Sequence, residues 1–487
     1  MKLPSETLTA RVGPILLPLA LTPPRCLGQQ LEFRIISGGE PGSPSVEYGN
    51  ARFERETERV YSLRCVVVAS FLLASMLVQP SGSEASAKLP DFKKVSADIE
   101  RLTEAKRFVE LAQLYEASNK HLRSPLVAIN EAVAWADAGR STQAIQALER
   151  SIEYGIRNPN VVTKYKSLGR LKSDPAWPRV ESQLAQLRRQ LSSVDGFEVH
   201  TDDADAFWKA FDLARAEPAR AEEFFSKMIL DGSPALRDYY ANRYFGVDDL
   251  VNVAIQTYPK YYQYLRNHFQ AEQLEPIRAQ VVANMNKLKD VYPEAIFPHG
   301  YLVIGTLNSA GSVTDLGVFI GLDRHGRGEG MPSDEMSESL KNSIGDTRFI
   351  SGTMTHELMH FQQNYRDTRE GDVLRAVIEE GVCDFLTGLV TGKPSEGVRQ
   401  RYLKEHEAEI IEDFRKEMNG TDLSKWMYSG SVGGRPADLG YTLGSEICRS
   451  YYELAADKKK ALYELLNTED LASLVRNSKY KAAIESR

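Results

Sequence analysis

Apolar residues recur at helical spacing over most of the chain from Phe92 to Asp290. Apolar residues stand at about every third or fourth position in "KRFVELAQLYEAS" and "VAINEAVAWADAGRSTQAIQALERSIEYGI". In the second segment this pattern is interrupted at Gly139-Arg140. This spacing predicts amphipathic helices joined by short turns. Later segments such as "YPKYYQYLRNHF" are rich in Tyr and Phe, and we interpret these aromatic residues as core packing.

A different pattern begins near Phe297, with two short apolar runs rich in β-branched and aromatic residues. They are "GYLVIGTL" from Gly300 to Leu307 and "LGVFIGLD" from Leu316 to Asp323, separated by the turn-rich "NSAGSVTD". We expect two strands of a small sheet here, followed by a Gly-rich loop from Arg324 to Pro332. Helices grouped around a small sheet predict the α+β class.

The helical pattern returns between Arg348 and Gln363 and contains the segment "THELMHF". His356 and His360 are four positions apart, so they share one face of the predicted helix. Two imidazoles so placed can converge on a single Zn²⁺, because histidine nitrogen is a preferred zinc ligand. Glu357 sits beside the first of them, where it can take a proton from a zinc-bound water and so act as general base.

A second amphipathic helix is expected from Leu374 to Leu389. Glu380 follows His360 by 380 − 360 = 20 positions, and Asp384 lies four further on, on the same helix face. As a third ligand, Glu380 would complete a His₂Glu site with an open position for water, and Asp384 could accept the second ring N–H of a ligating histidine. Glu379 competes for the ligand role but points about 100° away around the helix. A solvated helical face is the alternative interpretation of both glutamates.

These residues resemble the pattern of the gluzincin metallopeptidases, which is HExxH followed by ExxxD on the next helix. The match is position by position, at His356, Glu357, His360, Glu380 and Asp384. The run from about Ala283 to Tyr463, with "EEGVCDF" and "RPADLGYTLGSEIC", is also similar to a bacterial family of zinc proteases without assigned substrates. The resemblance implies a mostly helical, zincin-like domain with one zinc ion. It also implies a mixed sheet over the active-site helix and one strand available to an extended peptide.

A peptidase also needs a hydrogen-bond donor for the oxyanion that develops on the substrate carbonyl. We assign Tyr441 to this catalytic role because glycines lie on either side of it in "LGYTLG" and because the resemblance extends through this segment. Tyr428 and His406 are alternatives. Packing near a helix start is an equally good interpretation of Tyr441.

The first helical part, residues 88–191, resembles a tetratricopeptide repeat in the positions of Trp135, Ala138-Gly139, Ala144, Ala147-Leu148 and Ile152. The later "LKSDPAWPRVESQL" resembles the closing stretch that often follows such repeats. This resemblance implies a region that binds a protein partner. A plain helical bundle is the alternative, because a repeat array normally needs three or more units. Residues 192–487 then form the predicted peptidase domain, with its core at about 283–463.

The beginning of the chain carries a pattern typical of a secretory signal. Residues 59–87 combine basic residues, an apolar run from Cys65 to Val78 and the small residues Ala85-Ser86-Ala87. The apolar run is shorter than the roughly 20 residues that span a bilayer, so we predict an exported protein, periplasmic or secreted, without a stable membrane span. An uncleaved anchor or a buried helix is the alternative. We interpret residues 1–58 as the product of a start site assigned too far upstream, or as a disordered N-terminal extension.

Composition narrows the classes of partner. The 487 residues are 42% hydrophobic and 26% charged, with a net charge of −7. These values fit a globular protein of two domains, or of one domain with a helical extension. The chain has no basic field, so nucleic acid is not expected as a partner. The four cysteines form no CxxC pair and are too few for a disulfide framework.

Together these features predict an exported zinc-dependent metallopeptidase that hydrolyses peptide bonds in a peptide or protein substrate. The alternative is a periplasmic interaction module, in which the repeat-like region binds a partner and the zinc site is structural or inactive. Chelation distinguishes the two, because a structural zinc takes folding free energy with it when it leaves.

Overall fold

The helices of residues 88–191 begin and end at recognisable sequence signals. In the computed structural model, which describes residues 88–484 except 245, 333, 366–370, 394–396 and 429–433, the Ser124 hydroxyl caps α3 by accepting the amide of Val127. Gly139, at φ 70°, turns the chain from α3 into α4, as the Gly-Arg turn predicts. The helices are α1 (Phe92–Glu104), α2 (Phe108–Leu122), α3 (Pro125–Asp137), α4 (Ser141–Tyr154), α5 (Val161–Lys164) and α6 (Trp177–Leu191).

The second group of helices carries the aromatic residues that the sequence pattern assigned to the core. Tyr239, Tyr244, Tyr261 and Tyr262 are all buried, which confirms that assignment. The helices are α7 (Asp202–Ala216), α8 (Ala221–Asp231), α9 (Pro234–Tyr239), α10 (Val247–Leu250), α11 (Pro259–His268) and α12 (Ala271–Val291). A π-helical turn at Tyr240–Tyr244 continues α9.

The described strands form one mixed sheet of order β1-β2-β4-β3. The two predicted strands are present as β2 (Gly300–Val303) and β4 (Val318–Gly321), paired in parallel with Gly300 opposite Val318. Two further strands were not predicted: β1 (Val199–His200), parallel to β2, and β3 (Gly311–Val313), antiparallel to β4. The turn-rich stretch at residues 308–315 therefore contains an edge strand that its sequence pattern did not indicate. A three-residue edge strand of Gly, Ser and Val has too little apolar alternation to be recognised.

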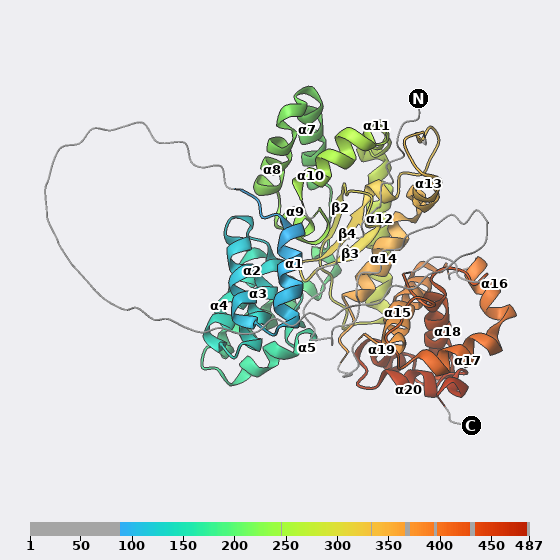
Figure 1. The fold of residues 1–487 in the computed structure, drawn as a ribbon. Coiled ribbons are helices and arrows are strands. Elements are labelled where there is room, and N and C mark those ends of the chain that lie inside the picture. Colours follow the sequence, from blue (N-terminus) through green and yellow to red (C-terminus); the bar gives the residue numbers. More distant parts are fainter. Residues whose placement is uncertain are drawn as a thin grey trace, which may run out of the picture. The chain divides into compact units, whose positions relative to one another are not determined.

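Helix α14 (Ile350–His360) packs on β3 and β4 with α12 beside it, as Figure 1 shows. Ile350, Met354 and Leu358 recur at four-residue spacing and are buried against these elements. Met354 lies directly on Gly300 of β2, where a Cβ atom would come within 2.7 Å of its sulfur. The opposite face of α14 is thereby left for its polar residues.

The C-terminal helices enclose that polar face from the other side. They are α15 (Val373–Thr391), α16 (Val398–Glu405), α17 (Glu407–Glu417), α18 (Leu439–Leu454), α19 (Lys458–Asn467) and α20 (Leu471–Arg476), whereas the short helix α13 (Glu338–Ser343) precedes α14. Helices α15 and α18 cross at Gly381 and Gly444, where a Cβ on Gly444 would lie 1.9 Å from the carbonyl oxygen of Val377. Only glycine permits this backbone approach, which brings the first turn of α18 close to α14.

Two buried aspartates join the first helices to the sheet region. Asp238 accepts hydrogen bonds from the hydroxyl of Ser124 and the amide of Leu126 at the start of α3, and from the hydroxyl of Thr314 beyond β3. Asp315 accepts hydrogen bonds from Asn158, Lys164 and Tyr165, which lie around α5. Helices and sheet are thus connected by hydrogen bonds as well as by apolar packing.

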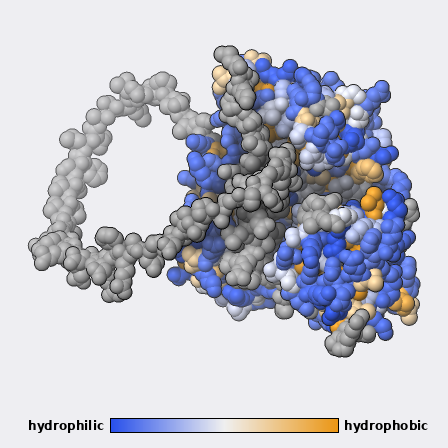
Figure 2. Space-filling view, turned by 45° about the vertical axis from the view of Figure 1, so that its right-hand side comes forward, coloured by the Kyte–Doolittle hydropathy of each residue, from blue (hydrophilic) through white to orange (hydrophobic). Residues whose placement is uncertain are grey.

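Residues 88–484, where described, belong to one compact unit, and the predicted domain boundary near residue 191 stays a prediction. The face seen in Figure 2 is mostly hydrophilic, with scattered hydrophobic patches. Within the described part of the chain, the search for a helix both long and apolar enough to span a bilayer found no candidate. The predicted signal at 59–87 and the extension at 1–58 lie outside the described residues.

Candidate metal centre

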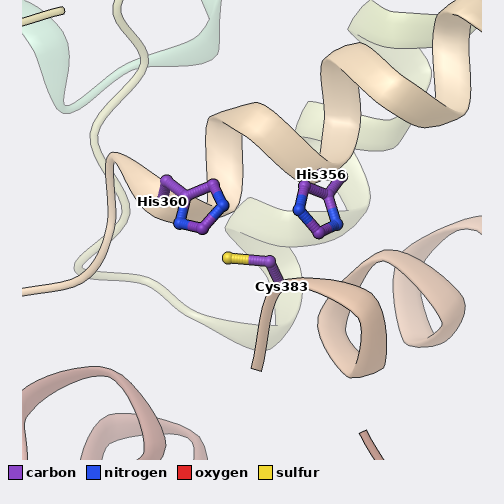
Figure 3. Close-up of side chains that lie close together, drawn as sticks. All are labelled: His356, His360 and Cys383. Carbon is purple, nitrogen blue, oxygen red and sulfur yellow. The ribbon is translucent and has the colours of Figure 1, made fainter. Parts of the chain in front are cut away.

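Helix α14 presents His356 and His360 side by side, as predicted from their four-residue spacing. Their ring centroids are 5.1 Å apart, and both side chains are mostly removed from solvent, with 15% and 22% of their surface exposed. Figure 3 shows the two rings extending from the same side of the helix. The helix is fixed in place by its buried apolar face and by a hydrogen bond from Asn284 of α12 to Thr355.

Helix α15 brings a carboxylate to both rings. Its N-terminus is capped by Asp372, whose side chain accepts the amide of Arg375, and it ends at Gly392 with φ 71°. About two turns into the helix, Glu380 places Oε2 3.2 Å from Nε2 of His356 and 3.3 Å from Nε2 of His360.

The distances from the Glu380 oxygen to the two ring nitrogens fit ligands of a tetrahedral zinc ion. Two ligand atoms at about 2.0–2.1 Å from zinc lie roughly 3.3 Å apart at the tetrahedral angle. Both distances from Glu380 match this value. Two imidazoles and one carboxylate are also the donor set of many catalytic zinc sites, so the residues present fit this metal.

The other ring nitrogens are held by hydrogen bonds. Nδ1 of His356 is 2.9 Å from Oδ1 of Asp384, and Nδ1 of His360 is 3.1 Å from Oε1 of Gln363. Oxygen acceptors at both Nδ1 atoms favour the tautomer that carries its proton there. The lone pairs of both Nε2 atoms then face the position between the rings and Glu380.

The electrostatics of the cluster favour a cation. Burial alone would lower the pKa of His356, but the hydrogen bonds to Asp384 and Glu380 raise it to about 10. Burial would raise the pKa of Glu380, yet His360 and His356 hold it well below its usual range. The carboxylate therefore stays ionised, and its negative charge lies where positive charge would be bound.

Cys383 is a neighbour of this cluster that the sequence patterns did not indicate. One atom each of Cys383, His356 and His360 lie within 4.8 Å of one another, and Figure 3 shows the thiol turned towards His360. The side chain of Gln363 connects them by donating to the sulfur at 3.4 Å. Burial raises the pKa of the Cys383 thiol, which keeps it protonated and makes it a weaker candidate ligand than Glu380. Cys383 and Cys448 are both free.

Glu357 lies next to the edge strand of the sheet. A Cβ atom on Gly311 of β3 would come within 2.4 Å of its Oε1, so the carboxyl group occupies the space that glycine leaves open. Burial raises the pKa of Glu357, while His360, His356 and Arg243 lower it. A carboxyl group with an elevated pKa beside a metal position is suited to accept and return a proton.

Tyr441, at the start of α18, lies over His356 with ring centroids 6.2 Å apart. Burial, followed by the charge of Glu380, raises its pKa far above neutrality, so its hydroxyl keeps its proton. Tyr428 also reaches the site, but its hydroxyl donates to Oε1 of Glu380 at 3.0 Å. The third candidate, His406, stacks on Tyr402 between α16 and α17 and has no described contact with these residues.

The competing glutamate points elsewhere. Glu379 pairs with Arg375 at 2.7 Å, and its backbone carbonyl accepts from Gln363. Of the two adjacent glutamates on α15, the structure thus places Glu380 at the rings.

A second group of metal-binding residue types lies on the far edge of the sheet, at Glu198, His200 and His299. Nδ1 of His299 accepts the amide of Glu198 at 3.2 Å, which leaves the proton of the neutral ring on Nε2. Burial and the charge of Arg157 lower the pKa of His299 to about 4. A cation beside the ring and an occupied lone pair both oppose metal binding there.

Comparison with known proteins agrees with a zinc centre on α14 and α15. Residues 322–471 match the family described as Predicted Zn-dependent protease (DUF2268), and this range contains His356, His360 and Glu380. No curated protein and no solved structure matches the chain. The family match supports a zinc protease for this part of the chain.

Proposed function

We propose that this protein is an exported zinc-dependent peptidase of the gluzincin type. The observation that carries the proposal is the position of the Glu380 carboxylate oxygen, 3.2 and 3.3 Å from the two Nε2 atoms of the HExxH helix. An active-site helix beneath an edge strand adds to it, because β3 is the edge of the sheet and lies beside Glu357.

In this proposal His356, His360 and Glu380 hold the zinc ion. A zinc ion bound there would polarise the substrate carbonyl and lower the pKa of a water molecule. Asp384 and Gln363 hold the two imidazoles in one tautomer and orientation, which keeps both Nε2 lone pairs available.

The remaining residues handle the proton and the substrate. Glu357 accepts a proton from the attacking water and passes it to the leaving amine. Tyr441 donates its hydroxyl hydrogen to the substrate oxygen as negative charge develops on it. Strand β3 is the edge of the sheet, and an extended peptide bound along it would gain affinity from main-chain hydrogen bonds.

The test compares the parent protein with Glu357→Gln and His360→Ala on a diverse peptide library, with cleavage read by mass spectrometry. We expect Glu357→Gln to keep its zinc content and lose at least about a hundred-fold in turnover, because general base catalysis contributes that much. His360→Ala should lose zinc. The matched control is Glu379→Gln, which removes a neighbouring carboxyl group that does not face the rings. Turnover by Glu357→Gln equal to that of the parent would refute the assigned base.

We also propose that the tetratricopeptide-like helices bind a protein partner and that the protein is exported through residues 59–87. A polar surface between α4 and α6 supports the first point, since Gln146, Glu149, Arg150, Glu153 and Gln183 line a groove there. Chelation tests the alternative of a structural zinc: removing the metal should abolish cleavage and leave the thermal transition nearly unchanged.

A further inference from the structure

Tyr428 is a mostly exposed residue whose hydroxyl reaches the proposed zinc ligand Glu380. The exposed fraction of the tyrosine is 67%, whereas that of the Glu380 side chain is 12%. Burial of the ring therefore does not explain the orientation of Tyr428. Its hydroxyl donates to Oε1 of Glu380 at 3.0 Å, and this hydrogen bond directs the side chain towards the ligand.

The backbone that carries Tyr428 is fixed to the start of α18. The amide of Gly440 donates to the carbonyl of Trp426 at 2.8 Å, and a Cβ atom on Gly440 would come within 2.4 Å of the sulfur of Met427. Trp426 and Met427 are both buried. Tyr428 itself has φ 57°, in the left-handed region that residues other than glycine adopt uncommonly. Such conformations persist where the surrounding structure holds them, and they cluster at functional sites.

The two oxygens of the Glu380 carboxylate have different partners. Oε2 lies 3.2 Å from Nε2 of His356 and 3.3 Å from Nε2 of His360. Oε1 accepts the hydroxyl hydrogen of Tyr428, since an ionised carboxylate can only accept. A hydrogen bond to Oε1 competes with coordination of a metal by that oxygen. The arrangement therefore favours a glutamate that binds a metal through Oε2 alone.

The number of glutamate oxygens that bind the metal matters for a catalytic site. Such zinc sites have three protein ligands and keep the fourth position for water or substrate. Carboxylates can bind metals through one oxygen or through both, and a second oxygen competes for the position that should stay open. Hydrogen bonds to ligating carboxylates orient them, and their loss typically costs ten- to a hundred-fold in metal affinity or activity.

Building on the proposed function, we propose that Tyr428 is a positioning residue that holds Glu380 so that it binds zinc through Oε2 alone. Oε1 stays with the tyrosine hydroxyl, and the open position of the site is left for water and substrate. Tyr441 lies beside Tyr428, with the two rings edge to face and their centroids 6.4 Å apart, and keeps its separate role as donor to the substrate oxygen.

The test is Tyr428→Phe, which removes the hydroxyl and keeps the ring. X-ray absorption at the zinc edge distinguishes the two binding modes, because a carboxylate bound through both oxygens brings its carbon atom closer to the metal. We expect this carbon to move to a shorter distance in Tyr428→Phe and turnover to fall about ten- to a hundred-fold. The thermal transition should stay nearly unchanged, since the ring is mostly exposed.

Two further tyrosine variants serve as controls. Tyr451→Phe also removes a hydroxyl that donates to a glutamate, but its partner is Glu464 and the bond joins α18 to α19. This variant should keep the zinc spectrum and the turnover of the parent. Tyr441→Phe should keep the spectrum and lose turnover, because its hydroxyl is assigned to the substrate and not to Glu380.

The zinc spectrum needs no substrate, so it separates this proposal from the proposed function. A parent protein that binds zinc but cleaves no peptide would refute the peptidase, and a shifted carboxylate carbon in Tyr428→Phe would still support the role of the tyrosine. An identical zinc spectrum in the parent and Tyr428→Phe overturns that role, whatever the turnover. A parent that binds no zinc overturns both.

Discussion

Asp384 determines which nitrogen of His356 carries the proton, through a hydrogen bond of 2.9 Å to Nδ1. We expect Asp384→Asn to weaken zinc binding by roughly ten- to a hundred-fold, because an amide can present its N–H to the ring and disturb the ligating tautomer. Competition titration against a chromophoric chelator measures the change. Glu379→Gln is the control, since that carboxyl group on the same helix pairs with Arg375. Equal affinities for Asp384→Asn and the parent would show that the ring needs no such partner.

At the same scale, local spacing was enough to find the residues that share a helix face. His356 with His360, and Glu380 with Asp384, are each four apart, and the helical repeat places such pairs together without knowledge of the fold. The position of Cys383 near the site could have been predicted from its spacing. It lies three positions after Glu380 and so on nearly the same helix face.

At the scale of elements, strand β3 and helix α14 meet through a glycine. We expect Gly311→Ala to lower turnover by at least about ten-fold while zinc content stays unchanged, because the added Cβ would lie 2.4 Å from Oε1 of Glu357 and displace the carboxyl group. Steady-state rates and metal analysis on the same sample check both parts.

The control for that substitution is Gly352→Ala on α14, where a Cβ meets no atom within 4 Å. Alanine there should leave turnover unchanged and raise the free energy of unfolding by up to about 1 kcal/mol, since alanine favours a helix over glycine. Unchanged turnover in Gly311→Ala would mean that Glu357 has room to move without loss of function.

Long elements with a clear period were predicted closely, and short ones were not. The expected helix from Leu374 to Leu389 is observed as Val373–Thr391, because its apolar face is continuous and its ends have cap residues. The strands β1 and β3 have two and three residues and are stabilised by neighbours distant in sequence. They therefore cannot be predicted from a local sequence pattern.

At the scale of the whole molecule, the buried Asp238 makes stability depend on pH. Burial raises its pKa to about 7, whereas in the unfolded chain it is near 4. Between these values the folded protein retains a proton that the unfolded chain has released, so the free energy of unfolding falls as pH rises from about 4 to 7.

Asp238→Asn should remove this contribution, which amounts to at most about 4 kcal/mol for a shift of roughly three pKa units. Denaturant titrations of the parent and the variant at several pH values give the difference between their curves. Asp212→Asn, at a half-exposed ion pair with Arg266, is the control. Parallel curves for parent and Asp238→Asn would show that Asp238 is ionised in the folded protein throughout this range.

The four strands of the sheet all end before residue 322, where the similarity to the zinc protease family begins. The stretch recognisable by similarity thus holds the proposed ligands and none of the strands on which α14 is seated. A fragment of residues 322–471 alone would expose Met354 and the adjoining apolar face of α14. In the intact chain Met354 packs on Gly300. Truncated or fused forms of the protein should therefore include the strands on which α14 packs. These strands begin far upstream of the HExxH motif, at Val199.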